Sequence, residues 1–294
     1  MIVGQRGPRH AITVLSFILP GLIPLALFTL GPLVASVGIS FLDWDLLGPP
    51  TLVGLDNYIG LLGDSDFHEA IGHTLYFLAG YLPIVIVGGL GLALALHQPL
   101  RGSTLFRSAY FVPVVSSWVV VALMWRWLLS PENGLVNYLL SLVGIAGPGW
   151  WAEPSWAMPA VIIATAWKDL GFVMVLLLAG LQSIPTEYYE AAEVDGAGRW
   201  ARFRHVTVPL LSPTLFFVLV ISLINSFQVF DQVWVMTGGG PAGSSSVIVE
   251  QIVRYAFSYN QMGYAAALSW LLFAVILVVT LIQFRLQRRW VSYA

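Results

Sequence analysis

The sequence contains no cysteine and a single lysine, and both shortages narrow what the chain can do. Without cysteine there is no disulfide framework, no thiolate metal site and no cysteine nucleophile. A phosphate-binding loop of the form G-x-x-x-x-G-K-[ST] needs a lysine, and Lys168 is preceded by Ala166 and Trp167 rather than by glycine. The chain itself is therefore not expected to bind a nucleoside triphosphate.

Charge is scarce as well. Only 10% of the 294 residues are charged and 58% are hydrophobic, against roughly a quarter charged in soluble domains. Six apolar stretches reach or exceed the roughly 18 to 20 residues that cross a bilayer as a helix. They are residues 11–41, 70–97, 107–129, 157–182, 210–236 and 263–285. The sequence predicts an all-α integral membrane protein with six transmembrane helices in one domain, residues 1–294.

Several chemistries are not indicated. A net charge of −2 and the absence of a basic patch argue against a nucleic-acid partner. The five histidines are scattered, so no pair shares a helix face as a metal site requires. The run Ser244-Ser245-Ser246 has no histidine base in its loop and is interpreted as a polar turn. No metal site and no enzymatic centre are predicted.

The positions of the basic residues predict the orientation. Ten of the thirteen Lys and Arg residues fall on one side of the predicted spans. They are Arg6, Arg9, Arg101, Arg107, Arg199, Arg202, Arg204, Arg285, Arg288 and Arg289. The first loop on the opposite side, residues 42–69, has acidic residues but no Lys or Arg. Because short cytoplasmic loops carry the excess of positive charge, both termini are expected to be cytoplasmic.

The cytoplasmic loop between spans four and five, residues 183–209, is too charged to cross the membrane. Its local chemistry predicts two short helices. Thr186 can cap the first, and Gly196 can end it in the left-handed conformation. The second is expected to begin near Arg199 and to stop at Pro209.

One face of the first helix has the shape of an inserting surface. Ala191 and Ala192 are small, and Tyr188 and Asp195 lie three and four positions away on the same side. Such a face suits insertion into a groove of a partner protein. Helix physics alone is equally compatible with a solvated amphipathic loop.

The loop resembles the cytoplasmic "EAA" loop in the membrane subunits of bacterial binding-protein-dependent ABC importers. The matching residues are Glu190, Ala191, Ala192, Asp195, Gly196, Ala197, Phe203 and Pro209. Residues 53–58, Val-Gly-Leu-Asp-Asn-Tyr, and residues 238–241, Gly-Gly-Gly-Pro, look like marks of the sugar and sn-glycerol-3-phosphate branch, which contains the maltose transporters.

The resemblance implies a multi-pass permease subunit of the bacterial inner membrane. Its partners would be a second homologous permease subunit, an ABC ATPase dimer and an extracytoplasmic solute-binding protein. This chain would hold no cofactor, while the ATPase would use ATP and Mg. In the family the loop forms coupling helices that sit in a cleft of the ATPase, where Glu190 would pair with a basic residue. The solute would be an oligosaccharide or a glycerol-phosphate-like compound.

Polar residues inside the predicted spans are candidates for the solute pathway, since burying a charge there costs about 2.5 to 3.5 kcal/mol on insertion scales. They are Lys168, Asp169, Asn225, Gln228 and Asp231, together with Arg126. The aromatic residues Trp167, Phe227 and Phe230 are near them in the sequence and are candidates because their rings could stack on the apolar face of a sugar. Alternatively, Asp169 pairs with Arg126 or Lys168 and only neutralises charge. Because adjacent helical residues point about 100° apart, Lys168 and Asp169 are expected to serve different neighbours.

The intramembrane carboxylates are also compatible with a different class of protein. A secondary transporter driven by an ion gradient would use Asp169 or Asp231 as its proton or sodium site and would need no ATPase. Such a protein gives no reason for the sequence of the 183–209 loop. An intramembrane hydrolase needs a nucleophile or metal constellation that the sequence lacks.

Overall fold

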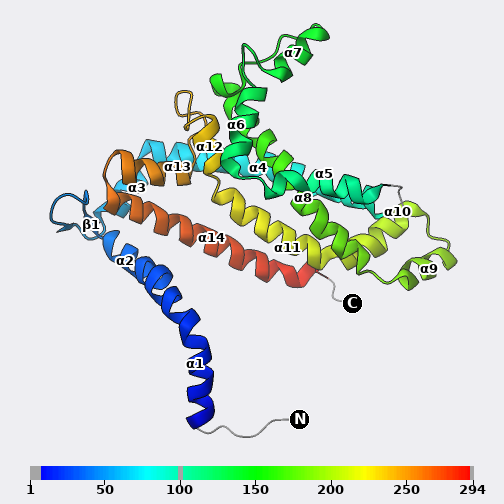
Figure 1. Ribbon diagram of the computed structural model, residues 1–294, viewed down its shortest axis with the longest axis horizontal. Helices are drawn as coiled ribbons and strands as arrows, with labels where there is room; N and C mark the ends of the chain where they lie inside the picture. Colours follow the sequence, from blue (N-terminus) through cyan, green and yellow to red (C-terminus); the bar gives the residue numbers. More distant parts are fainter. Residues whose placement is uncertain (1–7, 99–101, 292–294) are drawn as a thin grey trace. The chain divides into compact units, whose positions relative to one another are not determined.

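The computed structural model describes residues 8–98 and 102–291, and nearly all regular structure in them is helical (Figure 1). Arg6 and Arg101, used above for the orientation, lie outside the described residues. The chain divides into two compact units. The smaller runs to Gly63 and includes Ile252–Trp270, and the larger comprises Asp64–Gln251 and the residues from Leu271 onward. The predicted all-helical membrane fold is confirmed.

The smaller unit begins with one long apolar helix. It consists of α1 (Pro8–Leu25), a π-helical turn (Ala26–Leu30) and α2 (Gly31–Ile39). Its segment Thr13–Ile39 has 27 residues and a mean hydropathy of 2.1, enough to cross a membrane. Pro20 and Pro24 lie within α1 without ending it.

A short connection follows in the same unit. Its elements are β1 (Leu42–Asp43), β2 (Thr51–Leu52), antiparallel to β1, and α3 (Asp56–Gly63). The Asn57 side-chain amide donates to the carbonyl oxygens of Ser40 and Leu42, each at 2.9 Å, and the Tyr58 hydroxyl donates to Ser40 Oγ at 2.7 Å. Asn57 and Tyr58 of the predicted family mark therefore tie α3 to the end of the first span.

The larger unit is a helical bundle. Its helices are α4 (Ser65–His97), α5 (Ser103–Val115), α6 (Trp118–Leu128), α7 (Leu135–Leu142), α8 (Pro154–Gln182), α9 (Thr186–Val194), α10 (Arg199–Arg202), α11 (Val208–Phe227) and α12 (Asp231–Met236). A 3-10 turn (Trp150–Ala152) precedes α8, and a π turn (Phe203–Thr207) joins α10 to α11. Two of the last elements, α13 (Ile248–Val253) and α14 (Met262–Trp290), contain residues of both units, and the π turn between them (Arg254–Ser258) belongs to the smaller unit.

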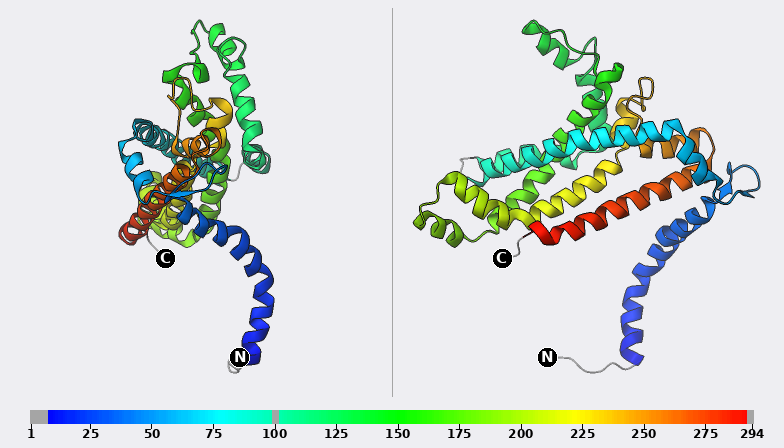
Figure 2. Two further views of the ribbon diagram at one scale, coloured as in Figure 1. Left: turned by 90° about the vertical axis from the view of Figure 1, so that its left-hand side faces the viewer. Right: turned by 180° about the vertical axis from the view of Figure 1, so that it is seen from behind.

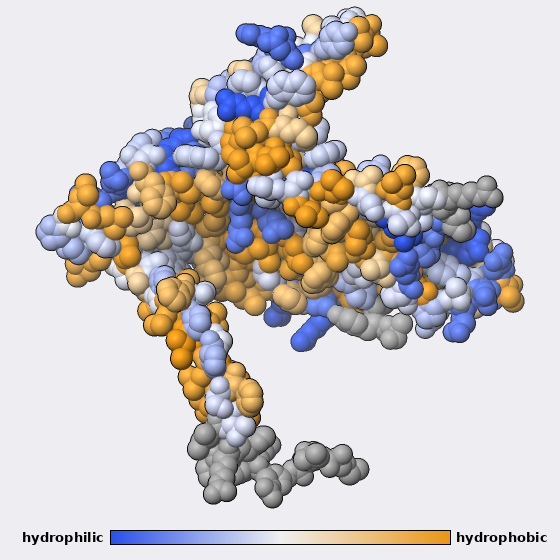
Figure 3. Space-filling model, in the orientation of Figure 1, coloured by the Kyte–Doolittle hydropathy of each residue, from blue (hydrophilic) through white to orange (hydrophobic). Residues whose placement is uncertain are grey.

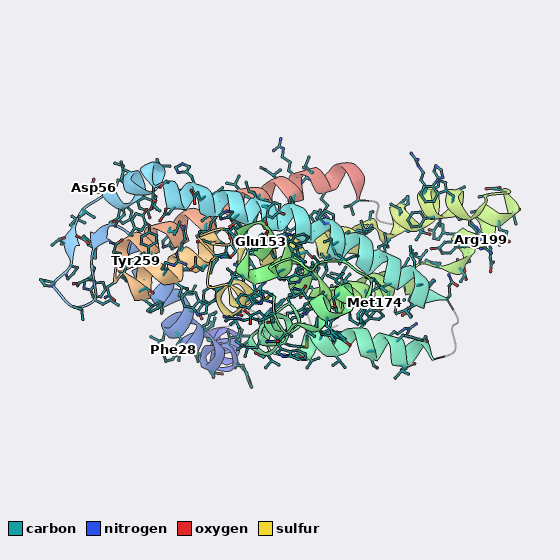
Figure 4. The ribbon with its side chains drawn as sticks, turned by 90° about the horizontal axis from the view of Figure 1, so that it is seen from above. Phe28, Asp56, Glu153, Met174, Arg199 and Tyr259 are labelled. Carbon is teal, nitrogen blue, oxygen red and sulfur yellow. The ribbon has the colours of Figure 1, made fainter. Side chains whose placement is uncertain are left out.

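Helix α8 is the centre of this bundle and packs against α4, α5 and α11. In Figure 4 the chain passes from Glu153, before α8, past Met174 to the end of the unit where Arg199 lies. Close approach depends on glycine. A Cβ atom on Gly89 of α4 would lie 2.5 Å from Val173 Cγ1, and one on Gly171 of α8 would meet the carbonyl oxygen of Tyr110. Small residues at these crossings let backbones approach as they do in membrane bundles.

Two predicted spans are broken. In place of one helix over 107–129, α5 and α6 meet at a 102° bend, because Ser116 and Ser117 are extended. In place of 210–236, the fifth span ends at Phe227, and three residues separate it from α12. The described residues thus contain five helices able to cross a membrane, or six if the bent pair is one span. Hydropathy averaged over a whole span missed both breaks because the few polar residues at each break are flanked by long apolar stretches.

Candidate functional site

A cavity of about 220 Å³ lies inside the larger unit, between α4, α8, the start of α6 and the break that follows α11. The lining residues are Phe77, Tyr81, Trp118, Thr165, Asp169, Asn225, Ser226, Gln228, Val229, Phe230, Asp231 and Gln232. Four residues predicted for the solute pathway, Asp169, Asn225, Gln228 and Asp231, therefore share one cavity. Phe230, noted near them in the sequence, lines it too.

Tyr81 orients the carboxylate of Asp169. The hydroxyl of Tyr81, on α4, donates to Asp169 Oδ2, on α8, at 2.7 Å. The ring of Tyr81 stacks on Phe77 with 5.4 Å between centroids and 10° between planes. Both aromatic residues are almost fully buried. The hydrogen bond from Tyr81 therefore orients the Asp169 carboxylate through Oδ2 and does not involve Oδ1.

The break after α11 supplies the other polar wall. The backbone leaves the helix at Gln228, whose N–H donates to the Asn225 carbonyl at 3.1 Å, and α12 begins at Asp231. Because non-helical backbone at membrane depth is tolerated only where it is buried in protein or lines a wet space, the break and the cavity belong together. The side chains of Asn225, Gln228 and Asp231 are exposed there.

Lys168 does not line the cavity. Its ammonium group donates to the carbonyl oxygens of Pro113 at 3.0 Å and Val114 at 2.8 Å, and lies 4.8 Å from the ring centroid of Trp118. Those carbonyls are at the last turn of α5, where a helix has unpaired acceptors and a negative dipole end. Lys168 therefore caps the broken span, and the expectation that Lys168 and Asp169 serve different neighbours is confirmed.

Three further candidates do not line the cavity. Trp167 is 40% exposed, and its ring packs edge-on against Trp125. Phe227 is buried in the helix bundle, with 6% exposed. Arg126 donates to the carbonyl oxygen of Val235 at 3.1 Å and stands over a ring of Trp151. Neither Arg126 nor Lys168 makes a direct ion pair with Asp169 in the described residues.

Sequence reasoning missed Phe77, Tyr81, Trp118 and Thr165 as lining residues, and also Ser226, Val229 and Gln232, which adjoin predicted ones. Phe77, Tyr81 and Thr165 stand in runs that read only as apolar helix. The signal for Trp118 was the preceding pair Ser116-Ser117, because two small polar residues inside an apolar run can mark a break in the helix. Nothing local distinguishes Phe77 or Tyr81, whose role depends on Asp169, 88 residues away from Tyr81.

The second candidate region is the loop of residues 183–209. Helix α9 ends at Val194 with Asp195 as its C-cap, and the next residue, Gly196, has a φ of +75°. The Gly196 N–H donates to the Glu193 carbonyl at 3.0 Å, and the Ala197 N–H donates to the Ala192 carbonyl at 2.8 Å. This pair of bonds is a Schellman motif, which satisfies carbonyls at a helix end. The predicted left-handed role of Gly196 is confirmed.

Two predictions for this loop are wrong. Thr186 is the first helical residue and not the cap, since Pro185 holds the cap position without a side-chain bond. Pro209 does not stop the second helix, because α10 continues through the π turn Phe203–Thr207 into α11. In that turn the Val208 N–H donates five residues back, to the Phe203 carbonyl. The wider turn accommodates a proline that cannot donate.

Two side-chain contacts brace the loop. The hydroxyls of Tyr189 and Thr207 lie 3.1 Å apart, and Arg202 Nη1 lies 3.1 Å from Glu193 Oε2. Glu190, by contrast, is exposed. Figures 1 and 2 place α9 and α10 at one end of α4, α8 and α11, away from α12. In Figure 3 hydrophilic residues gather over this end.

The other loop residues that match the family pattern are likewise either exposed or half-buried. Ala191, Asp195 and Gly196 are exposed, and Ala192, Ala197, Phe203 and Pro209 are half-buried. The family residues are therefore split between an outward surface on α9 and a packed base formed by the π turn and the start of α11. An outward surface on a braced base is a geometry suited to docking.

Comparison with known proteins gives consistent results. Residues 86–292 match the family model described as "Binding-protein-dependent transport system inner membrane component". The chain is 35% identical to the probable ABC transporter permease protein YurN of Bacillus subtilis, over 92% of this chain and 94% of that protein. It is 33% identical to the trehalose/maltose transport system permease protein MalF of Thermococcus litoralis, over 92% of each.

Solved structures agree with the sequence matches. A bacterial ABC transporter involved in the import of the acidic polysaccharide alginate contains a chain with a TM-score of 0.84 and 27% identity, covering 96% of both chains. A bacterial alginate ABC transporter in complex with an alginate pentasaccharide-bound periplasmic protein gives a TM-score of 0.83 at 26% identity, again over 96% of both chains.

Proposed function

This chain belongs to the family of binding-protein-dependent transport system inner membrane components, and from that membership we propose that it carries a carbohydrate across the membrane. It is a transmembrane subunit of an ABC-type importer, and not an enzyme. The observation that carries the proposal is agreement over the whole chain. Relatives that cover nine-tenths of it include a permease named for trehalose and maltose, and the similar solved structures are importers of a polysaccharide.

The partners follow from the family. The chain works with a solute-binding protein and with other subunits of the importer. The finer composition that we propose is a second homologous permease subunit and two copies of an ATPase, which binds the ATP and Mg that this chain does not. Lys168, the single lysine, is engaged by two carbonyl groups and has no phosphate-binding loop around it.

The 183–209 loop is the proposed contact with the ATPase. Its outward face carries Glu190, Ala191 and Asp195, all exposed, while Glu193 is held by Arg202. A short helix that is braced at its base moves as a unit, so a pull on α9 is transmitted through the π turn into α11 without a flexible joint. Closure of two ATPase subunits would thereby reorient α11 and the break that ends it.

The cavity is the proposed segment of the solute pathway in this subunit. It lies at the far end of α11 from the loop, and Asn225 and Gln228 at that end face it. Helix α11, to which the movement of α9 would be transmitted, thus also carries residues that line the cavity. Trp167, Lys168 and Phe227 take no part in this proposal, since they do not line the cavity.

The chain is a multi-pass inner membrane protein, and both termini are proposed to be cytoplasmic. The basic residues of the 183–209 loop, Arg199, Arg202 and Arg204, favour that side for α9 and α10. The same rule places Glu153 and the start of α8 on the outer side. Membership in an ABC importer family removes the reason for an ion-gradient mechanism at Asp169 or Asp231.

Reconstitution tests the proposal. The complete importer is placed in liposomes with its binding protein, and uptake of a panel of labelled oligosaccharides is followed with ATP inside or outside. Accumulation of at least one oligosaccharide that needs ATP on the side of the ATPase is the expected result. Accumulation driven by a proton or sodium gradient without ATP contradicts the proposal.

A further inference from the structure

The lining of the cavity contains two carboxylates and no basic side chain. Asp169 and Asp231 supply two carboxylates, and the remaining polar lining residues are neutral. These neutral residues are Tyr81, Thr165, Asn225, Ser226, Gln228 and Gln232. None of the residues that line the cavity is Lys, Arg or His. In low-dielectric surroundings this imbalance acts strongly on any charged solute.

The two cationic side chains nearest in sequence are committed elsewhere. Lys168 is 5% exposed and donates to Pro113 and Val114. Arg126 donates to the Val235 carbonyl and stacks on Trp151. Turning either group toward the cavity would break contacts and leave the carbonyl acceptors unpaired, which is costly for buried groups. Neither of these two side chains is therefore available as a counter-ion for an anionic solute in the observed arrangement.

The uncharged features of the cavity suit sugars. Phe77, Tyr81, Trp118 and Phe230 give it aromatic walls, which can cover the C–H face of a pyranose ring. Carboxylates accept strong charge-assisted hydrogen bonds from hydroxyl groups. Asp169, already oriented by Tyr81, is placed to accept from a sugar hydroxyl with its remaining capacity.

We propose that this cavity selects uncharged, hydroxyl-rich saccharides and rejects anionic ones such as uronates, sulfosugars and glycerol phosphates. The inference rests on the proposed function, in which the cavity is part of the solute pathway. It sets this chain apart from the structurally similar importer of an acidic polysaccharide. It also decides between the two solute classes that the sequence left open.

The test measures the binding of solutes to the importer in the absence of the binding protein. Saturation-transfer NMR is recorded on the assembled importer without binding protein, at millimolar concentrations of matched probes: maltotriose and xylotriose against trigalacturonate and glycerol 3-phosphate. We expect transfer to at least one uncharged probe, with signals about tenfold weaker for both anions. In the double variant Asp169→Asn with Asp231→Asn, the anion signals rise toward those of the uncharged probes.

A matched control is available on α4. Glu69 is an exposed carboxylate on the same helix as Tyr81 but does not line the cavity, so Glu69→Gln should leave the ratio unchanged. Equal or stronger transfer to the anions in the wild type overturns the inference. A discrimination that is unchanged in the double variant, or lost in Glu69→Gln, also overturns it. Failure of the proposed function is distinct: it is the absence of ATP-driven saccharide uptake in the liposome assay.

Discussion

Gly196 gives the sharpest perturbation of the 183–209 loop. Its φ of +75° is left-handed, and nothing lies within 4 Å of the position a Cβ would take. A side chain there is therefore disfavoured by backbone conformation and not by crowding. The left-handed conformation costs an L-residue roughly 1 to 2 kcal/mol, and a β-branched residue is least tolerant of it. We take about 2 kcal/mol for Gly196→Val, which lowers the equilibrium constant for the observed loop conformation about thirtyfold.

The consequence is uncoupling. With α9 no longer ended by the Schellman bonds, the docking face is presented in the observed geometry only a small fraction of the time. We expect solute uptake by reconstituted Gly196→Val to fall about tenfold or more, with the assembled complex still hydrolysing ATP at its basal rate. Uptake and hydrolysis are measured on the same liposomes, and assembly is checked by the yield of co-purified subunits.

Gly198 is the matched control. It is two residues away, also has open space for a Cβ, and has a φ of −67° that any residue adopts. Gly198→Val should therefore keep uptake within about twofold. Full uptake by Gly196→Val, or an equal loss in both variants, would refute the argument that the left-handed turn presents the docking face.

Three further predictions concern the bundle. Lys168→Met removes the ammonium group from two α5 carbonyls and should lower the stability of the assembled complex by about 2 kcal/mol, seen as a lower thermal midpoint; an unchanged midpoint contradicts the capping role. Tyr81→Phe keeps the ring but loses the hydrogen bond to Asp169, so the KM for uptake should rise about fivefold. An unchanged KM would contradict the claim that the oriented Asp169 carboxylate contacts the solute. Gly171→Ala places a Cβ against the Tyr110 carbonyl and should destabilise the complex by about 1 to 3 kcal/mol, while Gly91→Ala, with nothing within 4 Å, should be nearly neutral.

Hydropathy was sufficient to predict the fold class and the positions of most spans. The second, fourth and sixth spans match α4, α8 and α14 closely, because a membrane helix must be apolar over its length whatever it packs against. The breaks at Ser116 and after Phe227 could not be predicted in the same way. They depend on donors elsewhere in the bundle, such as the Lys168 ammonium, that satisfy carbonyl groups freed by the break.

In the 183–209 loop, local chemistry likewise predicted some features of the structure and missed others. It predicted the turn at Gly196, since a left-handed helix end is a property of a few consecutive residues. It failed at Pro209, where a proline after a helical run reads as a stop, and the π turn that absorbs it is set by packing. In the cavity, the polar residues could be selected from the sequence, but the aromatic walls and the partner of Asp169 required the tertiary fold.

The central claim is that an ATPase docks on α9 and that its ATP hydrolysis drives solute transport by this chain. The most direct measurement is affinity purification of the chain from its native membrane, with quantification of the ATPase that accompanies it, for wild type, Glu190→Arg and the control Glu69→Arg. Glu190 is exposed on α9, and Glu69 is exposed on α4, outside that loop. We predict a stoichiometric ATPase with wild type and Glu69→Arg, and a reduction of about tenfold or more with Glu190→Arg. A chain that purifies without an ATPase and moves solute in liposomes without ATP would contradict the account.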